Sequence, residues 1–298
     1  MANLRDIRNR ISSVNNTQQI TKAMKMVAAA KLRKAQNRMT SMRPYASKLK
    51  EVVSRLGSSS DGSNALLRKP DEIKRVLMIV VGSDKGLCGG FNNNLFKVVE
   101  RNISNEYQEH RSNDTLELIT IGRKSTQYFK KRDYNVVQEF PGFFDDLNYD
   151  VTADIMEHVI EKYRSEYYDK VLISFNEFKT VIAQNRRISQ VLPVDPESLK
   201  KDENEDDSLT TSDYLYEPDS KSILDDILPV YVIMQLWRAV LESNASEQGA
   251  RMAAMDNATE NAKELEEELT LKYNQARQSA ITTEISEIVS GAQALEES

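Results

Sequence analysis

Apolar residues recur every three or four positions from residue 230 to the C-terminus. No proline follows Pro229, and only Gly249 and Gly291 interrupt a run of residues that favour helices. The apolar positions are Leu265, Leu269, Tyr273, Ala276, Ala280, Ile281, Ile285, Ile288, Ala292 and Leu295. This spacing is typical of a coiled-coil seam or of the buried face of an amphipathic helix. At about 1.5 Å per residue such a helix would be about 100 Å long, so part of it should project from any compact domain.

A second run with the same spacing occupies residues 3–56 at the start of the chain. Its seam positions are Leu4, Ile7, Ile11, Val14, Thr17, Thr21, Met24, Ala28, Leu32, Ala35, Met39, Met42, Ala46, Leu49, Val53 and Leu56. Pro44 should kink this helix or remove one hydrogen bond, and the polar loop that begins at Gly57 should end it. Because a seam needs a partner, we expect the two long helices to pair with each other.

Between these runs, short apolar segments alternate with amphipathic ones. The predicted strands are 76–81, 116–121, 135–140 and 170–175, and the predicted helices are 95–103, 124–131 and 152–168. Such alternation predicts a Rossmann-like α/β domain with a mostly parallel sheet. Residues 180–183 and 188–194 are expected to add one or two antiparallel strands. The acidic, polar stretch 196–212 reads as an exposed loop.

Charge differs strongly between the two ends of the chain. Residues 1–56 carry 13 Lys and Arg against 2 Asp and Glu, a net charge of +11. Residues 230–298 carry 5 against 12, a net charge of −7. Opposite charge suits the two helices as neighbours, and their connection through one domain favours antiparallel pairing. A basic nucleic-acid arm is the alternative, but residues 1–44 contain no aromatic side chain for base stacking, so we do not expect nucleic acid as a partner.

Composition indicates a soluble protein of a reducing compartment. Cys88 is the only cysteine, which excludes a disulfide framework and a cysteine-based metal site. The longest apolar run, 76–81, is far too short to cross a bilayer, and the N-terminus has no apolar signal-peptide core.

The sequence offers little for catalysis. The glycine-rich loop 82–92 follows the first strand, where nucleotide phosphates bind in such folds. It matches neither the P-loop spacing nor Gly-x-Gly-x-x-Gly, so we favour a tight turn with close packing. His110 and His158 lie in polar helical contexts, and no base is indicated beside Cys88. We therefore expect no catalytic, cofactor or metal site in this chain.

Two terminal segments carry a resemblance to a known family. Thr17-Gln-Gln-Ile-Thr-Lys-Ala-Met-Lys-Met-Val-Ala-Ala-Ala-Lys-Leu and Ile281-Thr-Thr-Glu-Ile-Ser-Glu-Ile-Val-Ser-Gly-Ala closely resemble the gamma subunit of rotary F-type ATP synthases. Asp84-Lys-Gly-Leu-Cys-Gly-Gly-Phe-Asn, Asp213-Tyr-Leu-Tyr-Glu-Pro-Asp and Ala245-Ser-Glu-Gln-Gly-Ala-Arg-Met look like the same family. The match runs in order from about residue 1 to 295.

This resemblance implies an antiparallel coiled coil that forms the central shaft inside a ring of alternating alpha and beta subunits. Proton flow would turn a ring of c subunits, and the shaft would drive the beta subunits through successive conformations, where ATP is made. The chain itself would be non-catalytic. It would be peripheral, without inserting in the membrane, at the cytoplasmic face of a bacterial cell membrane. An N-terminus that begins with the shaft motif favours a bacterial protein, and a single cysteine excludes the regulatory pair of chloroplast members.

The resemblance also assigns residues to partners. Lys22, Met24, Lys25, Arg277, Gln278 and Thr282 are expected to contact the beta subunits. Tyr214, Tyr216 and Glu217 are expected to form a foot near the c ring and the epsilon subunit. Ile285, Ile288 and Leu295 should form an apolar tip that enters a sleeve of the alpha–beta ring.

Pattern and resemblance together divide the chain into four parts: a shaft helix over 1–56, an α/β domain over 75–195, an acidic loop and foot over 196–219, and a second shaft helix over 220–298. If the two helices start level at the domain, the second should extend past the first from about residue 282. The alternative is a free-standing coiled-coil scaffold or a nucleotide-binding regulator with an α/β head.

Overall fold

The computed structural model describes residues 4–58, 64–181, 183–196, 217 and 219–296, with side chains of the last helix up to Ala292. The chain forms two compact units. We call the unit Met1–Ala28 with Arg251–Ser298 the helical pair, and the unit Ala29–Ala250 the α/β unit.

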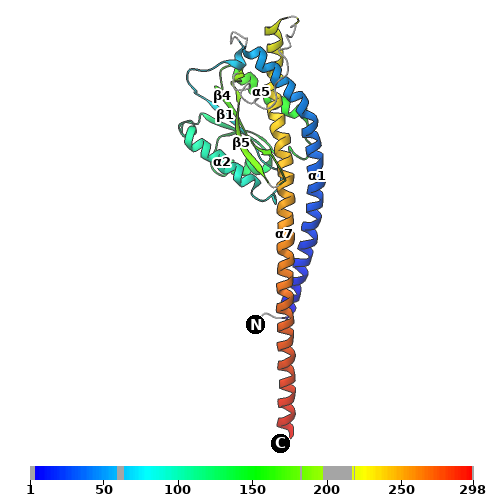
Figure 1. The fold of residues 1–298 in the computed structure, drawn as a ribbon. Helices are drawn as coiled ribbons and strands as arrows, with labels where there is room; N and C mark the ends of the chain where they lie inside the picture. The colour runs from blue at the N-terminus through cyan, green and yellow to red at the C-terminus, as the bar shows by residue number, and fades with distance from the viewer. Residues whose placement is uncertain (1–3, 59–63, 182, 197–216, 218, 297–298) are drawn as a thin grey trace. The chain divides into compact units, whose positions relative to one another are not determined.

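Two long helices run through these units (Figure 1): α1 (Leu4–Ser58, 55 residues) and α7 (Ser220–Glu296, 77 residues). Neither ends at its internal proline, Pro44 or Pro229. Helix α7 starts well before Pro229 because the Asp219 carboxylate accepts hydrogen bonds from the backbone N–H groups of Lys221 and Ser222, both at 2.9 Å. Such an N-cap satisfies donors that the first turn leaves unpaired.

The remaining elements build the α/β unit. They are η1 (Ala65–Leu67), β1 (Val76–Val81), α2 (Phe91–Glu106), α3 (Gln108–Ser112), β2 (Leu116–Ile121), α4 (Arg123–Lys130), β3 (Val136–Phe140), α5 (Tyr149–Arg164), β4 (Lys170–Phe178) and β5 (Gln184–Leu192). The five strands form one sheet in the order β3-β2-β1-β4-β5. The first four are parallel, with Val76 of β1 beside Leu116 of β2 and Lys170 of β4, and β5 is antiparallel to β4. The predicted mostly parallel sheet is confirmed.

Helices cover both faces of the sheet. Side chains alternate between the faces of a strand, so β1 contributes to two cores. Leu77, Ile79 and Val81 pack with buried residues of α1, α5 and α7, whereas Val76, Met78 and Val80 pack mainly with α2. The first core contains, among others, Val53 of α1, Val159 of α5 and Val232 of α7, each no more than 1% exposed. The two long helices are therefore built into the core of the α/β unit.

One detail of the predicted strands was wrong. Thr180, Val181 and Ala183 are not part of a strand: the Thr180 N–H donates to the Ala183 carbonyl at 3.0 Å in the turn that joins β4 to β5. The predicted antiparallel strand 188–194 is confirmed as β5, which spans Gln184–Leu192 and ends before Pro193, so β4 and β5 make a single hairpin. The short helix α3 was also missed; it contains no buried residue that could have produced an apolar period.

The helical pair confirms the predicted seam, with two local shifts. Ile7, Thr21 and Ala28 of α1 are buried, as are Met255, Ala262 and Leu269 of α7. Thr17 and Leu265 are exposed instead of buried, and their neighbours Gln18 and Glu266 are half-buried in their place. Long polar side chains can lay their aliphatic stems along a seam while their polar ends stay in water. A prediction based only on apolar residues therefore assigned Thr17 and Leu265 to the seam in place of Gln18 and Glu266.

Candidate functional site

A polar layer crosses the seam of the helical pair. The hydroxyl oxygens of Thr21 and Thr259 lie 2.8 Å apart, and Lys25 Nζ donates to Asp256 Oδ1 at 2.5 Å. Residue numbers rise along α1 as they fall along α7, so the helices are antiparallel, as predicted. Polar pairs within a seam fix its register at some cost in stability.

This layer separates the residues that sequence reasoning grouped around Met24. Lys22 is exposed, Met24 is half-buried, and the Lys25 side chain is 39% exposed while paired with Asp256. The structure therefore brings Met24 and Lys25 to the seam and leaves Lys22 in solvent. A partner's carboxylate would meet Lys22 as an available charge but would compete with Asp256 for Lys25.

Apolar side chains on the outer side of α1 were missed by the sequence analysis. Ile20, Met26 and Val27 are 60%, 62% and 56% exposed. Ile20 and Val27 are seven residues apart and therefore lie on nearly the same side of the helix. Clustered exposed apolar side chains are a mark of interaction surfaces. The signal was present in the sequence as apolar residues at positions off the seam.

The end of α7 extends past the start of α1 in the described chain. The contacts of Thr21 with Thr259 and of Lys25 with Asp256 place Leu4 opposite about residue 276. Every described residue of α7 from Arg277 to Ala292 is exposed. The extension thus begins about six residues earlier than expected from two helices that start level at Leu56 and Val230.

The predicted tip residues lie on this extension. Ile281, Ile285, Ile288 and Val289 are 47%, 56%, 66% and 52% exposed, and the side chain of Leu295 lies outside the described ones. Four large apolar side chains on three turns of an exposed helix form a continuous apolar surface that favours association with a partner. We call Ile281, Ile285, Ile288 and Val289 the apolar tip.

Arg277, Gln278 and Thr282 precede or border the apolar tip and are all exposed. The Thr282 hydroxyl donates to the Gln278 carbonyl at 3.0 Å, which leaves its oxygen able to accept a further hydrogen bond. Of the predicted foot, Glu217 is exposed, and Tyr214 and Tyr216 lie outside the described residues. Glu217 belongs to the α/β unit, whereas the predicted beta-subunit contacts belong to the helical pair.

The glycine-rich loop after β1 is closed by a carboxylate. Asp84, only 6% exposed, accepts hydrogen bonds from the backbone N–H groups of Arg123 (2.9 Å), Gly142 (2.6 Å) and Phe144 (2.9 Å). These donors follow β2 and β3 at the edge of the sheet where a nucleotide would bind in related architectures. Here an anion of the chain itself takes the backbone donors that a phosphate would use, and it would repel a second anion.

Close packing explains the glycines of this region. Gly122 has φ +93°, and a Cβ there would lie 2.9 Å from the backbone of Ser83. Cys88 is buried beside Asn92, whose amide Nδ2 donates to Ser83 Oγ at 2.7 Å. Both observations fit the tight-turn interpretation of residues 82–92.

The described residues contain no group of three or more His, Cys, Asp or Glu side chains that could hold a metal ion. His110 Nδ1 lies 3.0 Å from Thr115 Oγ1, a local contact that ties α3 to the start of β2. Within the part of the chain that the structure describes, no helix is both long and apolar enough to span a bilayer.

Comparison with known proteins gives matches over the whole chain. A family model described as ATP synthase matches residues 3–295. The ATP synthase gamma chain of Chlorobaculum tepidum is 49% identical over 298 residues, with 100% of both chains covered. The ATP synthase gamma chain of Salinibacter ruber is 47% identical over 307 residues, again with 100% of both covered.

Solved structures share the fold. One chain is from the rotor of Euglena gracilis mitochondrial ATP synthase, with a TM-score of 0.66 at 19% identity over 93% of this chain and 98% of that one. Another is from the central stalk and c-ring of Tetrahymena thermophila mitochondrial ATP synthase, with a TM-score of 0.58 at 26% identity over 80% of this chain and 99% of that one.

Proposed function

The chain belongs to the ATP synthase gamma-chain family and is a component of the central stalk, and on this premise we propose that its helical pair is a rotating shaft. In this proposal the shaft turns with a proton-driven ring of c subunits and pushes each beta subunit through successive conformations. Residues 1–56 and 220–298 supply the shaft, residues 75–195 the α/β domain, and residues 196–219 the acidic loop and foot.

The observation that carries this proposal is the apolar tip beyond the start of α1. Ile285 and Ile288 are more than half exposed on a helix that no other described residue covers. A soluble chain that acts alone gains nothing from such a surface, because exposed apolar area promotes association. An apolar sleeve in the alpha–beta ring would cover it and still let it turn, since apolar contacts have no fixed direction.

Contacts with the beta subunits are assigned to both helices of the pair. Lys22, Met24 and Lys25 of α1 would face acidic loops, and Arg277, Gln278 and Thr282 of α7 would hydrogen-bond closer to the tip. Exposure of Lys22 and of all three α7 residues supports this assignment. Lys25 would exchange its partner Asp256 for a carboxylate of a beta subunit, which makes its contact dependent on the angle of rotation.

At the other end of the shaft, Tyr214, Tyr216 and Glu217 would contact the epsilon subunit and the c ring. In this proposal the chain is a peripheral subunit at the cytoplasmic face of a bacterial cell membrane. The finding that no described helix could cross a bilayer is compatible with attachment through the c ring.

The chain would be non-catalytic, with ATP made on the beta subunits. The closed loop around Asp84 supports this, because its buried carboxylate occupies the backbone donors at the sheet edge. We expect no ATP hydrolysis by the purified chain, measured by phosphate release. Turnover that disappears on changing Lys85 to Ala would contradict the assignment.

Recovery of the assembled complex tests the proposed function as a whole. The tagged chain should recover alpha, beta and epsilon subunits from detergent-solubilised membranes, and a bead attached to the recovered complex should rotate when ATP is added. A free-standing scaffold would recover none of these subunits. That result, with the chain properly folded by circular dichroism, would refute the shaft.

A further inference from the structure

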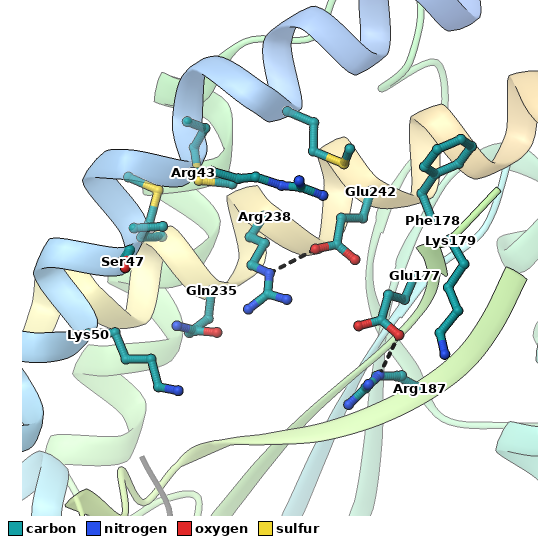
Figure 2. A pocket seen from close by; sticks show the side chains of 14 residues that line it. Arg43, Ser47, Lys50, Glu177, Phe178, Lys179, Arg187, Gln235, Arg238 and Glu242 are labelled. Atoms are coloured by element: carbon teal, nitrogen blue, oxygen red, sulfur yellow. Dashed lines mark hydrogen bonds and ion pairs between the residues drawn. The ribbon is translucent and has the colours of Figure 1, made fainter. Parts of the chain in front are cut away.

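A groove in the α/β unit lies between α1, α7 and the β4–β5 hairpin (Figure 2). It consists of two cavities of about 500 and 430 Å³ that share Lys50, Glu177, Arg187, Gln235 and Arg238 along their common border. Five cationic side chains line it, and we call it the basic groove: Arg43, Lys50, Lys179, Arg187 and Arg238. Its residues come from three separate stretches of the chain, all within one unit.

Two carboxylates partly neutralise the basic groove. Arg187 Nε donates to Glu177 Oε2 at 2.7 Å, and Arg238 Nε donates to Glu242 Oε1 at 2.8 Å. Although burial opposes it, hydrogen bonds from Arg187 and Asn185 hold the pKa of Glu177 below its usual value. Glu177 is thus a stable anion and already committed to Arg187.

Cationic charge remains after these pairs are made. Arg43 and Lys179 add two positive charges beyond the two ion pairs of Arg187 and Arg238. Among the described residues, no carboxylate pairs with Arg43 or Lys179. In Figure 2 the Arg43 side chain reaches across from α1 while Lys179 stands at the hairpin, on opposite sides of the cavity. Cations arranged in this way favour an anionic ligand that is long enough to reach both.

A buried carboxylate oxygen in the same groove lacks a hydrogen-bond donor within the described part of the chain. Glu242 is 6% exposed; its Oε1 is bonded to Arg238, but its Oε2 has no hydrogen-bond partner among the described residues. An unsatisfied buried carboxylate oxygen is costly, and an N–H donor from a ligand would remove that cost. An inorganic phosphate dianion would supply negative charge but no such donor.

We propose that the basic groove binds an extended acidic peptide segment of a partner protein. Its Asp or Glu side chains bind Arg43 and Lys179, and a backbone N–H donates to Glu242 Oε2. A peptide combines regularly spaced carboxylates with N–H donors, which is the combination the groove presents. The methionine side chains of Met39 and Met42 line one wall and supply adaptable apolar contact beside the charged groups. All of these residues lie in the α/β unit, so the proposal does not depend on the shaft.

The chain's own acidic stretch is the rival occupant. Asp202, Glu203, Glu205, Asp206 and Asp207 lie outside the described residues, and the test must separate them from a partner's segment. A variant with these five residues changed to Asn or Gln removes the rival without touching the groove.

The test uses the purified full-length chain and a fluorescein-labelled peptide of alternating glycine and aspartate, with binding followed by fluorescence anisotropy. We expect saturable binding that weakens with salt. Arg43→Gln with Lys179→Gln should weaken binding about tenfold, because two charge-assisted contacts are lost. The matched control, Lys97→Gln with Arg101→Gln on the exposed side of α2, removes the same charge and should bind like the parent.

A second probe separates a built site from general charge attraction. The same peptide with N-methylated backbone keeps its carboxylates but cannot donate to Glu242 Oε2, and we expect it to bind about tenfold more weakly. The proposal is overturned if the two double variants lose affinity equally or if N-methylation has no effect. It is also overturned if the parent binds no peptide, and binding that appears only in the variant of residues 202–207 would assign the groove to the chain's own segment. Thermal unfolding monitored by circular dichroism confirms that each variant is folded.

Discussion

Replacing Ile285 and Ile288 with aspartate should prevent assembly of the chain with alpha and beta subunits while leaving the α/β unit folded. Both side chains belong to the apolar tip, at 56% and 66% exposure. Fully burying an isoleucine contributes about 1.5–3 kcal/mol relative to leaving it exposed. Because somewhat over half of each side chain is still exposed, a sleeve would add about 1–2 kcal/mol per residue.

Burial of the two residues in such a sleeve would therefore contribute about 2–4 kcal/mol to assembly, which corresponds to about 30-fold to 700-fold in affinity. Aspartate removes this contribution and adds the cost of placing charge in an apolar socket. The assay is the fraction of chain that co-elutes with alpha and beta subunits in size-exclusion chromatography over a range of subunit concentrations. The aspartate variant should therefore need a concentration of alpha and beta subunits at least about 30-fold higher than the parent needs to reach half assembly.

Two controls make the result specific. Ile285→Leu with Ile288→Leu keeps the apolar surface and should assemble like the parent. Thr283→Asp with Ser290→Asp adds the same charge on roughly the opposite side of the same helix, since each residue advances about 100°. If the aspartates at 285 and 288 assemble normally, the tip needs no socket. If both aspartate pairs impair assembly equally, charge alone is responsible and the apolar-sleeve reasoning is refuted.

Three further predictions concern contacts inside the chain and at its basic surface. Asp84→Ala removes one acceptor of three backbone N–H groups and should lower the free energy of unfolding by about 2–4 kcal/mol in urea titration; an unchanged midpoint would show that water replaces the carboxylate. Thr21→Cys with Thr259→Cys should form a disulfide under mild oxidation, whereas Thr21→Cys with Thr270→Cys should not, and the reverse result would exclude the antiparallel register. Lys22→Ala with Lys25→Ala should cost less than about 1 kcal/mol in stability, because both side chains are at least partly exposed, yet reduce ATP-driven proton pumping of the assembled complex. If the variant pumps protons as fast as the parent, these two lysines are exposed to solvent and make no functional contact with a partner.

The seam of the helical pair was predictable because burial follows the helical period so closely. Ile7, Thr21 and Ala28 are buried where a three-and-four spacing places them. The spacing failed where a polar side chain with a long stem took the seam, as Glu266 does beside Leu265. A pattern of apolar residues cannot register a contact that is made by the methylene groups of a glutamate.

The start of α7 shows how packing can outweigh a local signal. Pro229 suggests a boundary because proline lacks the N–H of a helix interior. Helix α7 nevertheless begins at Ser220, the residue at which the predicted second shaft helix starts; Asp219 caps it, and Leu224 and Leu228 are buried in the core. Tertiary packing of the first turns thus outweighs the local cost of one proline, and only the Asp-Ser-Lys-Ser sequence around the cap carried a local sign of it.

The basic groove was not predictable from the sequence. Arg43 of α1, Lys179 of the turn after β4 and Arg238 of α7 are separated by long stretches of chain, and each residue alone looks like an ordinary surface cation. What defines the groove is the unpartnered oxygen of Glu242, which depends on packing that no local pattern encodes. The same is true of Asp84, whose three donors follow strands at the edge of the sheet.

The shared core of α1, α7 and the sheet has a mechanical consequence for the α/β unit. Val53, Val232 and Ile79 lie in one cluster of fully buried side chains, so neither helix can turn about its own axis there without opening that core. The helical pair is held differently, by a narrow seam with a hydroxyl contact and a partly exposed ion pair. A twist applied to the chain should therefore deform the helical pair elastically, while the packed core of the α/β unit resists the same twist.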